Sequence, residues 1–79
     1  MKDQSRKLLE ELSHELQMAG ELDPETRKLL QRIHEEIETG PAERAIERAK
    51  EIETRFAARH PVAERIARVL IDSLGKMGI

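Results

Sequence analysis

The sequence predicts an all-α protein, with four helical segments that form a small antiparallel bundle or a pair of helical hairpins. Apolar residues recur at spacings of three and four along the 79-residue chain, which is the period of a helix with one buried face. Gly and Pro interrupt this pattern at three places. Charged residues make up 38% of the chain, enough to cover the outer faces of the helices. These observations predict a single helical domain over residues 1–79.

The first segment, about residues 3–19, carries a leucine-rich stripe. Its apolar members are Leu8, Leu9, Leu12, Leu16 and Ala19. Gly20 follows, and glycine adopts the left-handed conformation that closes a helix C-terminus without a steric penalty. The first helix is therefore expected to end at this glycine.

The second segment covers about residues 24–38. Asp23 can accept hydrogen bonds from the N–H groups of the first turn, and Pro24 suits the first helical position because an N–H there has no intrahelical partner. The apolar stripe consists of Leu29, Leu30, Ile33 and Ile37. Three glutamates crowd the last turn, where the helix dipole disfavours negative charge, so we expect this end to fray. They are Glu35, Glu36 and Glu38.

The third segment, about residues 41–59, follows the Gly40-Pro41 junction and has a heptad-like stripe of the coiled-coil type. Its members are Ala42, Ala45, Ala49, Ile52 and Phe56. The alanines allow another helix to approach closely, and Phe56, the one aromatic residue of the chain, supplies bulk at the far end.

The fourth segment, about residues 61–75, has the widest apolar arc of the chain. Pro61 disfavours a helical conformation in the residue before it, so His60 is expected to help close the preceding turn. The stripe comprises Val62, Ile66, Val69, Leu70 and Leu74. All the linkers are short, which favours antiparallel packing of consecutive helices.

The histidines are the residues that titrate near neutral pH, and their surroundings favour structural roles. Glu11 and His14 have the Glu-x-x-His spacing of carboxylate-bridged di-iron bundles. A second such pair would need a glutamate three residues before His34, where the chain has Gln31. His14 also lies on the side of its helix opposite the leucine stripe. We therefore expect no metal site, no cofactor and no catalytic residue, and the chain is not predicted to be an enzyme.

Composition also bears on partners and location. Six arginines occupy the third and fourth segments, but glutamates alternate with them and the net charge is −2, so nucleic-acid binding is disfavoured. No stretch approaches the roughly 20 apolar residues of a membrane span, and the charged N-terminus lacks the apolar core of a signal peptide. The absence of cysteine fits a reducing compartment. A cytoplasmic protein that does not bind membranes is the prediction.

A chain of this size has a small core, so the apolar stripes favour association with a second copy. We expect a homodimer or higher homo-oligomer that works as a non-catalytic structural or adaptor module. The alternative is a small regulatory protein that binds another macromolecule, with a protein favoured over nucleic acid. The C-terminal tail could dock on its own chain or on a partner protein. Candidate interaction residues are Phe56, Ile66, Val69, Leu70, Leu74, Met77 and Ile79.

Several short motifs resemble those of the bacterial domain-of-unknown-function family DUF4404. They are Leu22-Asp23-Pro24-Glu25-Thr26-Arg27, Arg55-Phe56, His60-Pro61, Ile71-Asp72 and the tail Leu74-Gly75-Lys76-Met77-Gly78-Ile79. They occur in the order typical of that family and extend over the full length, although the Gly40-Pro41 junction is shorter than the polar linker expected of relatives. The resemblance implies a bacterial cytoplasmic all-α protein without an assigned activity, so it transfers no catalytic residue.

Overall fold

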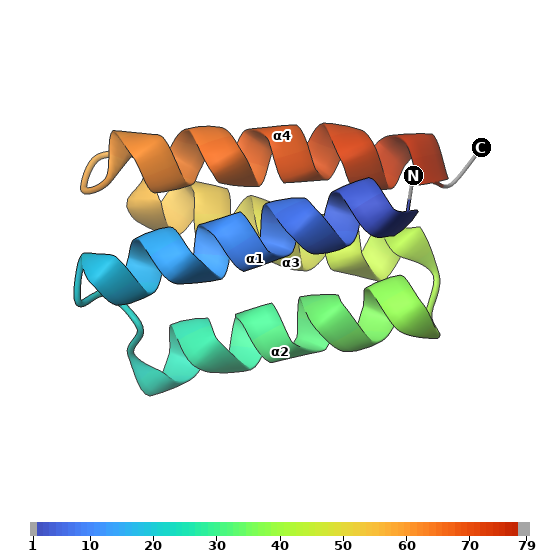
Figure 1. The fold of residues 1–79 in the computed structure, drawn as a ribbon, viewed down its shortest axis with the longest axis horizontal. Coiled ribbons are helices and arrows are strands. Elements are labelled where there is room, and N and C mark those ends of the chain that lie inside the picture. The colour runs from blue at the N-terminus through green and yellow to red at the C-terminus, as the bar shows by residue number, and fades with distance from the viewer. Residues whose placement is uncertain (1, 78–79) are drawn as a thin grey trace.

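The structure, a computed structural model, describes residues 2–77. These residues form four helices, and this range contains no strand. The helices are α1 (Lys2–Met18), α2 (Pro24–Glu38), α3 (Ala42–Phe56) and α4 (Pro61–Met77). Consecutive helices run in opposite directions (Figure 1). The predicted all-α bundle is therefore confirmed, and within residues 2–77 no helix is long and apolar enough to cross a membrane.

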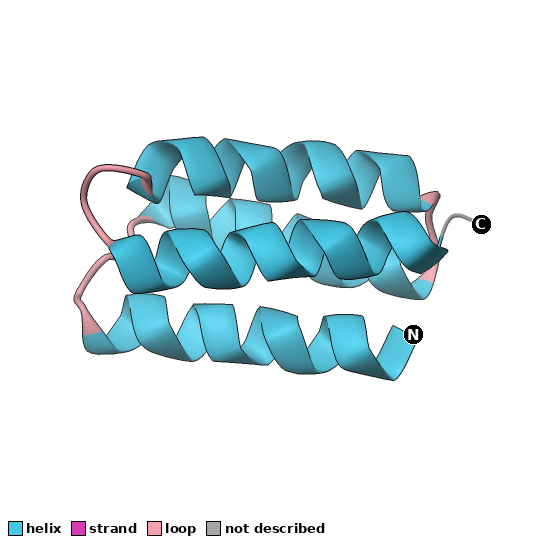
Figure 2. Cartoon of the chain, turned by 90° about the horizontal axis from the view of Figure 1, so that it is seen from above, coloured by secondary structure: helices cyan, strands magenta, loops and turns pink. Residues whose placement is uncertain are grey.

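The four helices close into a ring in which each one packs against two others (Figures 1 and 2). α4 lies between α3 and α1, so the last helix packs against the first. α3 and α4 share the most extensive contact, and α1 and α2 the least. Because α1 and α4 are antiparallel neighbours, the start of α1 and the end of α4 lie at the same end of the bundle.

The predicted stripes of the first three helices supply most of one core inside a single chain, but the stripe predicted for α4 was wrong in part, because Ala63 and Ala67 are buried in place of Val62 and Val69. The buried side chains of the core are Leu9, Leu12, Leu16, Leu29, Leu30, Ile33, Ile37, Ala45, Ala49, Ile52, Phe56, Ala63, Ala67, Leu70 and Leu74. Alanines on both α3 and α4 permit the close approach of these two helices, and Phe56 fills the wider end. α4 thus buries a face centred on Ala63 and Ala67, and Val62 and Val69 stay at its edge, 49% and 41% exposed.

Local chemistry fixes the turn between α1 and α2. Gly20 has φ +71°, and the N–H of Glu21 donates to the carbonyl of Leu16 at 2.9 Å, which is the pattern of a Schellman motif. After the turn, Asp23 Oδ1 accepts from the N–H of Thr26 at 2.7 Å and caps α2. That hydrogen bond lowers the pKa of Asp23. Both features match the predicted ends of the two helices.

The turn between α3 and α4 differs from the expectation, because α3 ends at Phe56 and not near Arg59. The N–H of His60 donates to the carbonyl of Phe56 at 2.9 Å, which closes the turn. The His60 ring then caps α4, since its Nδ1 accepts from the N–H of Ala63 at 3.2 Å. At the other end, α4 continues through Gly75 to Met77, two residues beyond the predicted stop.

Candidate interaction surface

The candidate interaction residues divide into buried and accessible groups. Phe56, Leu70 and Leu74 are each 0% exposed, so the folded chain offers none of them to a partner. Of the others, Val69 is exposed, whereas Ile66 and Met77 are partly buried against the core. Ile79 lies outside the described residues. An interface on this chain would therefore use the edge of α4.

A buried polar contact at one end of the bundle fixes the register of α1 against α4. The hydroxyls of Ser5 and Ser73 lie 2.7 Å apart, and Ser5 Oγ donates to Met77 Sδ at 3.2 Å. Ser73 must then donate to Ser5, because each hydroxyl has one hydrogen. The two serines are 0% and 3% exposed, so water does not compete for the contact. Sequence periodicity could not identify this pair, since serine on an apolar face gives no signal of its partner.

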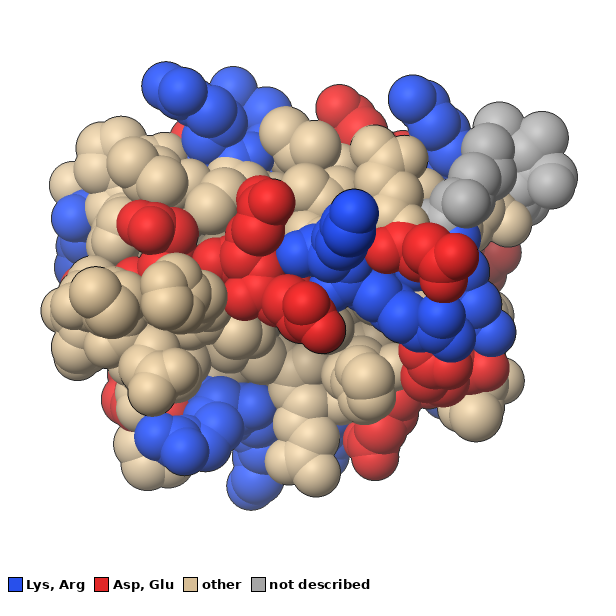
Figure 3. All heavy atoms as spheres, viewed as in Figure 1, with Lys and Arg blue, Asp and Glu red and all other residues tan. Residues whose placement is uncertain are grey.

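The surface between α1 and α4, here called the α1–α4 face, carries an apolar strip on its α4 side. The strip consists of Val62, Ile66 and Val69, which follow one another at spacings of four and three. Ser73 extends the same helical row, and its contact with Ser5 shows that this row borders α1. In Figure 3, which looks onto this part of the molecule, uncharged surface alternates with acidic and basic side chains.

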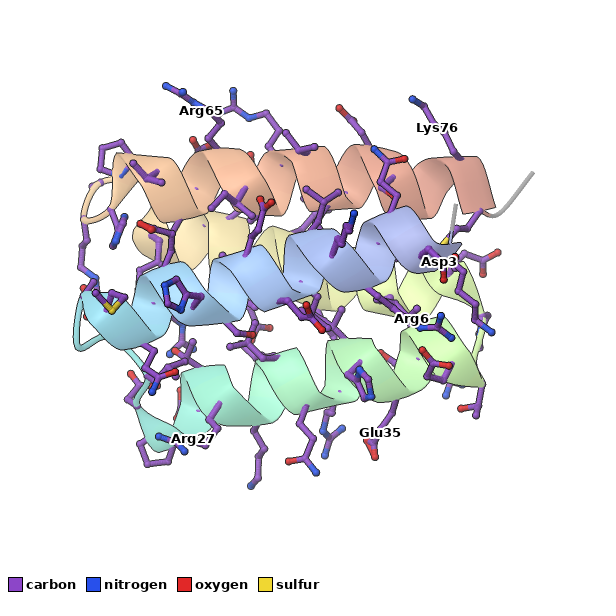
Figure 4. All side chains as sticks on the ribbon, viewed as in Figure 1. Asp3, Arg6, Arg27, Glu35, Arg65 and Lys76 are labelled. Carbon is purple, nitrogen blue, oxygen red and sulfur yellow. The ribbon has the colours of Figure 1, made fainter. Side chains whose placement is uncertain are left out.

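Charged side chains of both signs surround the strip. Lys7 and Glu11 are exposed on α1, and Arg65 and Asp72 are exposed on α4. Figure 4 shows Arg65 pointing away from the bundle. Within residues 2–77, none of these four side chains takes part in an ion pair. The α1–α4 face therefore combines accessible apolar area with charges that have no partner in the described part of the chain.

Most arginines of α3, of α4 and of the turn between them are bound by acidic residues, unlike Arg65. The contacts are Arg48 with Glu36 at 2.8 Å, Arg55 with Glu25 at 3.1 Å, Arg59 with Glu21 at 3.3 Å and Arg68 with Glu53 at 3.2 Å. Hydrogen bonds to Glu53 and Glu64 raise the pKa of Arg68. These pairs leave α3 without the unmatched cationic strip that a phosphate backbone would need.

Cations from both neighbouring helices bind the acidic end of α2. Arg6 of α1 forms a two-bond contact with Glu38, with N···O distances of 2.5 and 2.6 Å. Its hydrogen bonds lower the pKa of Glu38 and raise that of Arg6. Arg48 of α3 binds Glu36 in the same turn. α2 extends to Glu38, the predicted end, and these contacts oppose the fraying that the helix dipole favours in an isolated helix.

An open groove of about 470 Å³ runs between α1 and α2, and both His14 and His34 line it. His14 is exposed, as its helical position predicts. Glu11 does not line the groove, so the Glu-x-x-His pair does not converge on His34. Within residues 2–77, no group of three or more His, Asp or Glu side chains is placed to hold a metal ion. The groove brings together His14 and His34, and the sequence did not predict that these two histidines would line one site.

Comparison with known proteins places the chain in a family. Residues 6–79, which include most of α1 and all of α2 to α4, match the domain of unknown function DUF4404. The chain belongs to the DUF4404 family. The resemblance deduced from Phe56, His60-Pro61 and the C-terminal tail is thus confirmed. No curated protein and no solved structure matches the chain, so the α1–α4 face must be interpreted from its own chemistry.

Proposed function

We propose that this DUF4404 protein is a non-catalytic helical module that associates with a second copy of itself and serves as a structural or adaptor protein. The α1–α4 face carries the proposal. Val62 and Val69 on this face are 49% and 41% exposed, and charges of both signs lie beside them. Exposed apolar area with a polar rim is typical of association surfaces.

The chemistry of the remaining polar groups supports a non-catalytic role. Ser5 and Ser73 are buried and bonded to each other, which places them out of reach of a substrate. The His60 ring accepts the backbone N–H of Ala63 and thereby has a structural use. His14 and His34 line an open groove, and the side-chain hydrogen bonds of Ser5 and Ser73, two serines of the described range, go to each other and to Met77 and not to these histidines.

The alternative, a regulatory protein that binds a different macromolecule, would use the same face. A protein partner fits it better than nucleic acid does, because ion pairs with glutamates already occupy Arg48, Arg55 and Arg68. Acidic residues around a cation weaken its attraction for phosphate. The distinction between a second copy and another protein depends on whether the purified chain associates by itself.

Sedimentation velocity on the purified chain, from about 1 µM to about 1 mM, tests the proposal. Because the α1–α4 face spans only two helices, the interface is small, and we expect reversible dimerisation with a dissociation constant in the micromolar to millimolar range. The mass should rise from 9.1 kDa toward twice that value as concentration increases. A monomer at every concentration would refute self-association and would favour a heterologous protein partner for the face.

A further inference from the structure

We infer that the second copy docks on the α1–α4 face about a two-fold axis that crosses α4 at Val69, so that α4 packs antiparallel against α4 of its partner. In this arrangement Arg65 binds the partner's Asp72, and Lys7 binds the partner's Glu11. The inference rests on the proposed self-association and specifies its geometry. Three observations carry it: the register of α1 against α4, the positions of four charges, and the location of the exposed valines.

The register follows from the buried serines. Ser5 and Ser73 face each other at 2.7 Å, so they lie at the same level along the bundle. α1 and α4 are antiparallel and each rises about 1.5 Å per residue. Leu9 is four residues after Ser5 on α1, and Val69 is four residues before Ser73 on α4. These two residues therefore lie at the same level along the bundle. A two-fold axis perpendicular to the helices at this level crosses both of them.

The charges on each helix are arranged symmetrically about that level. A two-fold axis across an antiparallel helix pair brings together residues that are equally far from it on opposite sides. The midpoint between Arg65 and Asp72 lies half a residue from Val69, which is about 0.8 Å along the axis of α4. The midpoint between Lys7 and Glu11 is Leu9. One axis consequently pairs opposite charges on both helices, and it does so twice by symmetry.

The four charged groups are accessible for these contacts. All are exposed, and within residues 2–77 none has an ion-pair partner in its own chain. By contrast, Arg68 on the α3 side of α4 is bound to Glu53 and Glu64. Arg65 points away from the bundle in Figure 4 and is accessible to a second copy.

The valines decide between this axis and a two-fold axis parallel to the helices. The parallel axis would place α4 over α1 of the partner, where Val69 would lie at the level of Leu9, between the exposed Lys7 and Glu11. The perpendicular axis brings Val69 against Val69 of the partner subunit. It also places Val62, seven residues before Val69, opposite the partner's Lys76, whose methylene stem can cover it. The perpendicular axis therefore covers Val69 with an apolar side chain, whereas the parallel axis would set Val69 between two charged ones.

Disulfide trapping tests the position of the axis directly, since the chain has no cysteine of its own. Val69→Cys places one thiol on the axis, where the two Cα atoms can come within the roughly 7 Å that a disulfide requires. Lys50→Cys, at an exposed position of α3, is the matched control. Under mild oxidation we expect Val69→Cys to form covalent dimer at least about tenfold faster than the control, and circular dichroism should show both variants folded.

Charge exchange tests the ion pairs. Arg65→Asp and Asp72→Lys each set like charges against each other across the axis, and each should weaken self-association by about 3- to 30-fold. An equimolar mixture should associate more strongly than either variant alone, because every contact between the two different chains then joins opposite charges. Arg32→Asp and Glu35→Lys, which make the same charge changes on α2, should leave association unchanged.

The outcomes separate the geometry from the proposed function. A wild-type chain that stays monomeric overturns self-association itself. A wild-type dimer whose Val69→Cys variant cross-links no faster than Lys50→Cys, or whose charge-exchanged variants do not complement each other, overturns the axis and leaves self-association standing. Faster cross-linking at position 69 together with complementation establishes the antiparallel α4 contact.

Discussion

The hydrogen bond between Ser5 and Ser73 makes a quantitative prediction, because the two serines and Met77 form a chain with a defined direction. Ser73 donates to Ser5, and Ser5 donates to Met77 Sδ. Ser5→Ala would remove the acceptor of the Ser73 hydroxyl and leave that hydroxyl buried without a partner. Ser73→Ala would leave the Ser5 hydroxyl bonded to the methionine sulfur. The two single substitutions therefore have different costs.

The magnitudes follow from the burial of the pair. An orphaned buried hydroxyl costs about 1–3 kcal/mol, and alanine in place of serine inside a helix returns about 0.5 kcal/mol. Ser5→Ala should thus lower the free energy of unfolding by about 0.5–2.5 kcal/mol, and Ser73→Ala by about 0–1 kcal/mol. The double substitution orphans no group, so its net effect should be close to zero. The expected coupling energy between the two sites is the sum of the two single costs, about 0.5–3.5 kcal/mol.

Urea denaturation of the wild type, both single variants and the double variant gives this coupling directly, at a concentration where the chain is monomeric. Ser13→Ala is the control for helix propensity, since Ser13 is a partly buried serine of α1 for which the structure gives no side-chain hydrogen bond within residues 2–77. The thermal midpoints should fall by about 4–8 °C for each kcal/mol of lost stability in a domain of this size. Additive single effects in the double variant would show that the serines do not act as a pair.

Three further predictions concern helix ends and the ion pair between Arg6 and Glu38. Gly75→Ala should raise the free energy of unfolding by about 0.5–1 kcal/mol, because Gly75 is helical and its added Cβ meets no atom within 4 Å. Gly20→Ala should lower the free energy of unfolding by about 1–2 kcal/mol, because Gly20 has φ +71°. Urea titrations of both variants compare these effects. His60→Ala should lower the free energy of unfolding by about 0.5–2 kcal/mol through loss of the α4 cap. Asparagine can cap a helix, so a His60→Asn variant that is no more stable than His60→Ala by thermal unfolding would contradict a capping role. The pKa of Glu38 is lowered in the folded state, so the unfolded chain binds more protons; the stabilisation is complete above about pH 4.3 and declines as pH falls further. Urea midpoints between about pH 2 and 6 should show this decline, and Arg6→Met should reduce it.

The turn between α1 and α2, which was predicted from neighbouring residues alone, agreed with the structure. Gly20 ends α1 and Asp23-Pro24 begins α2, because backbone conformation and capping are decided within one turn of helix. The leucine stripe of α1 and the alanine stripe of α3 also face the core as their periodicity indicates.

The tertiary structure determined the features that depend on which helices pack against one another. Ring closure places α4 between α3 and α1, and this position determines that Ala63 and Ala67 face the core while Val69 stays at the edge. It also brings Arg6 to Glu38, which holds the end of α2 that an isolated helix would fray. The sequence by itself determined four amphipathic helices and the turn between α1 and α2, because local dihedral preferences and periodicity require no knowledge of neighbours. Only the packed bundle determined which apolar residues stay exposed, because an amphipathic helix can bury either edge of its stripe and its neighbours select the one it buries.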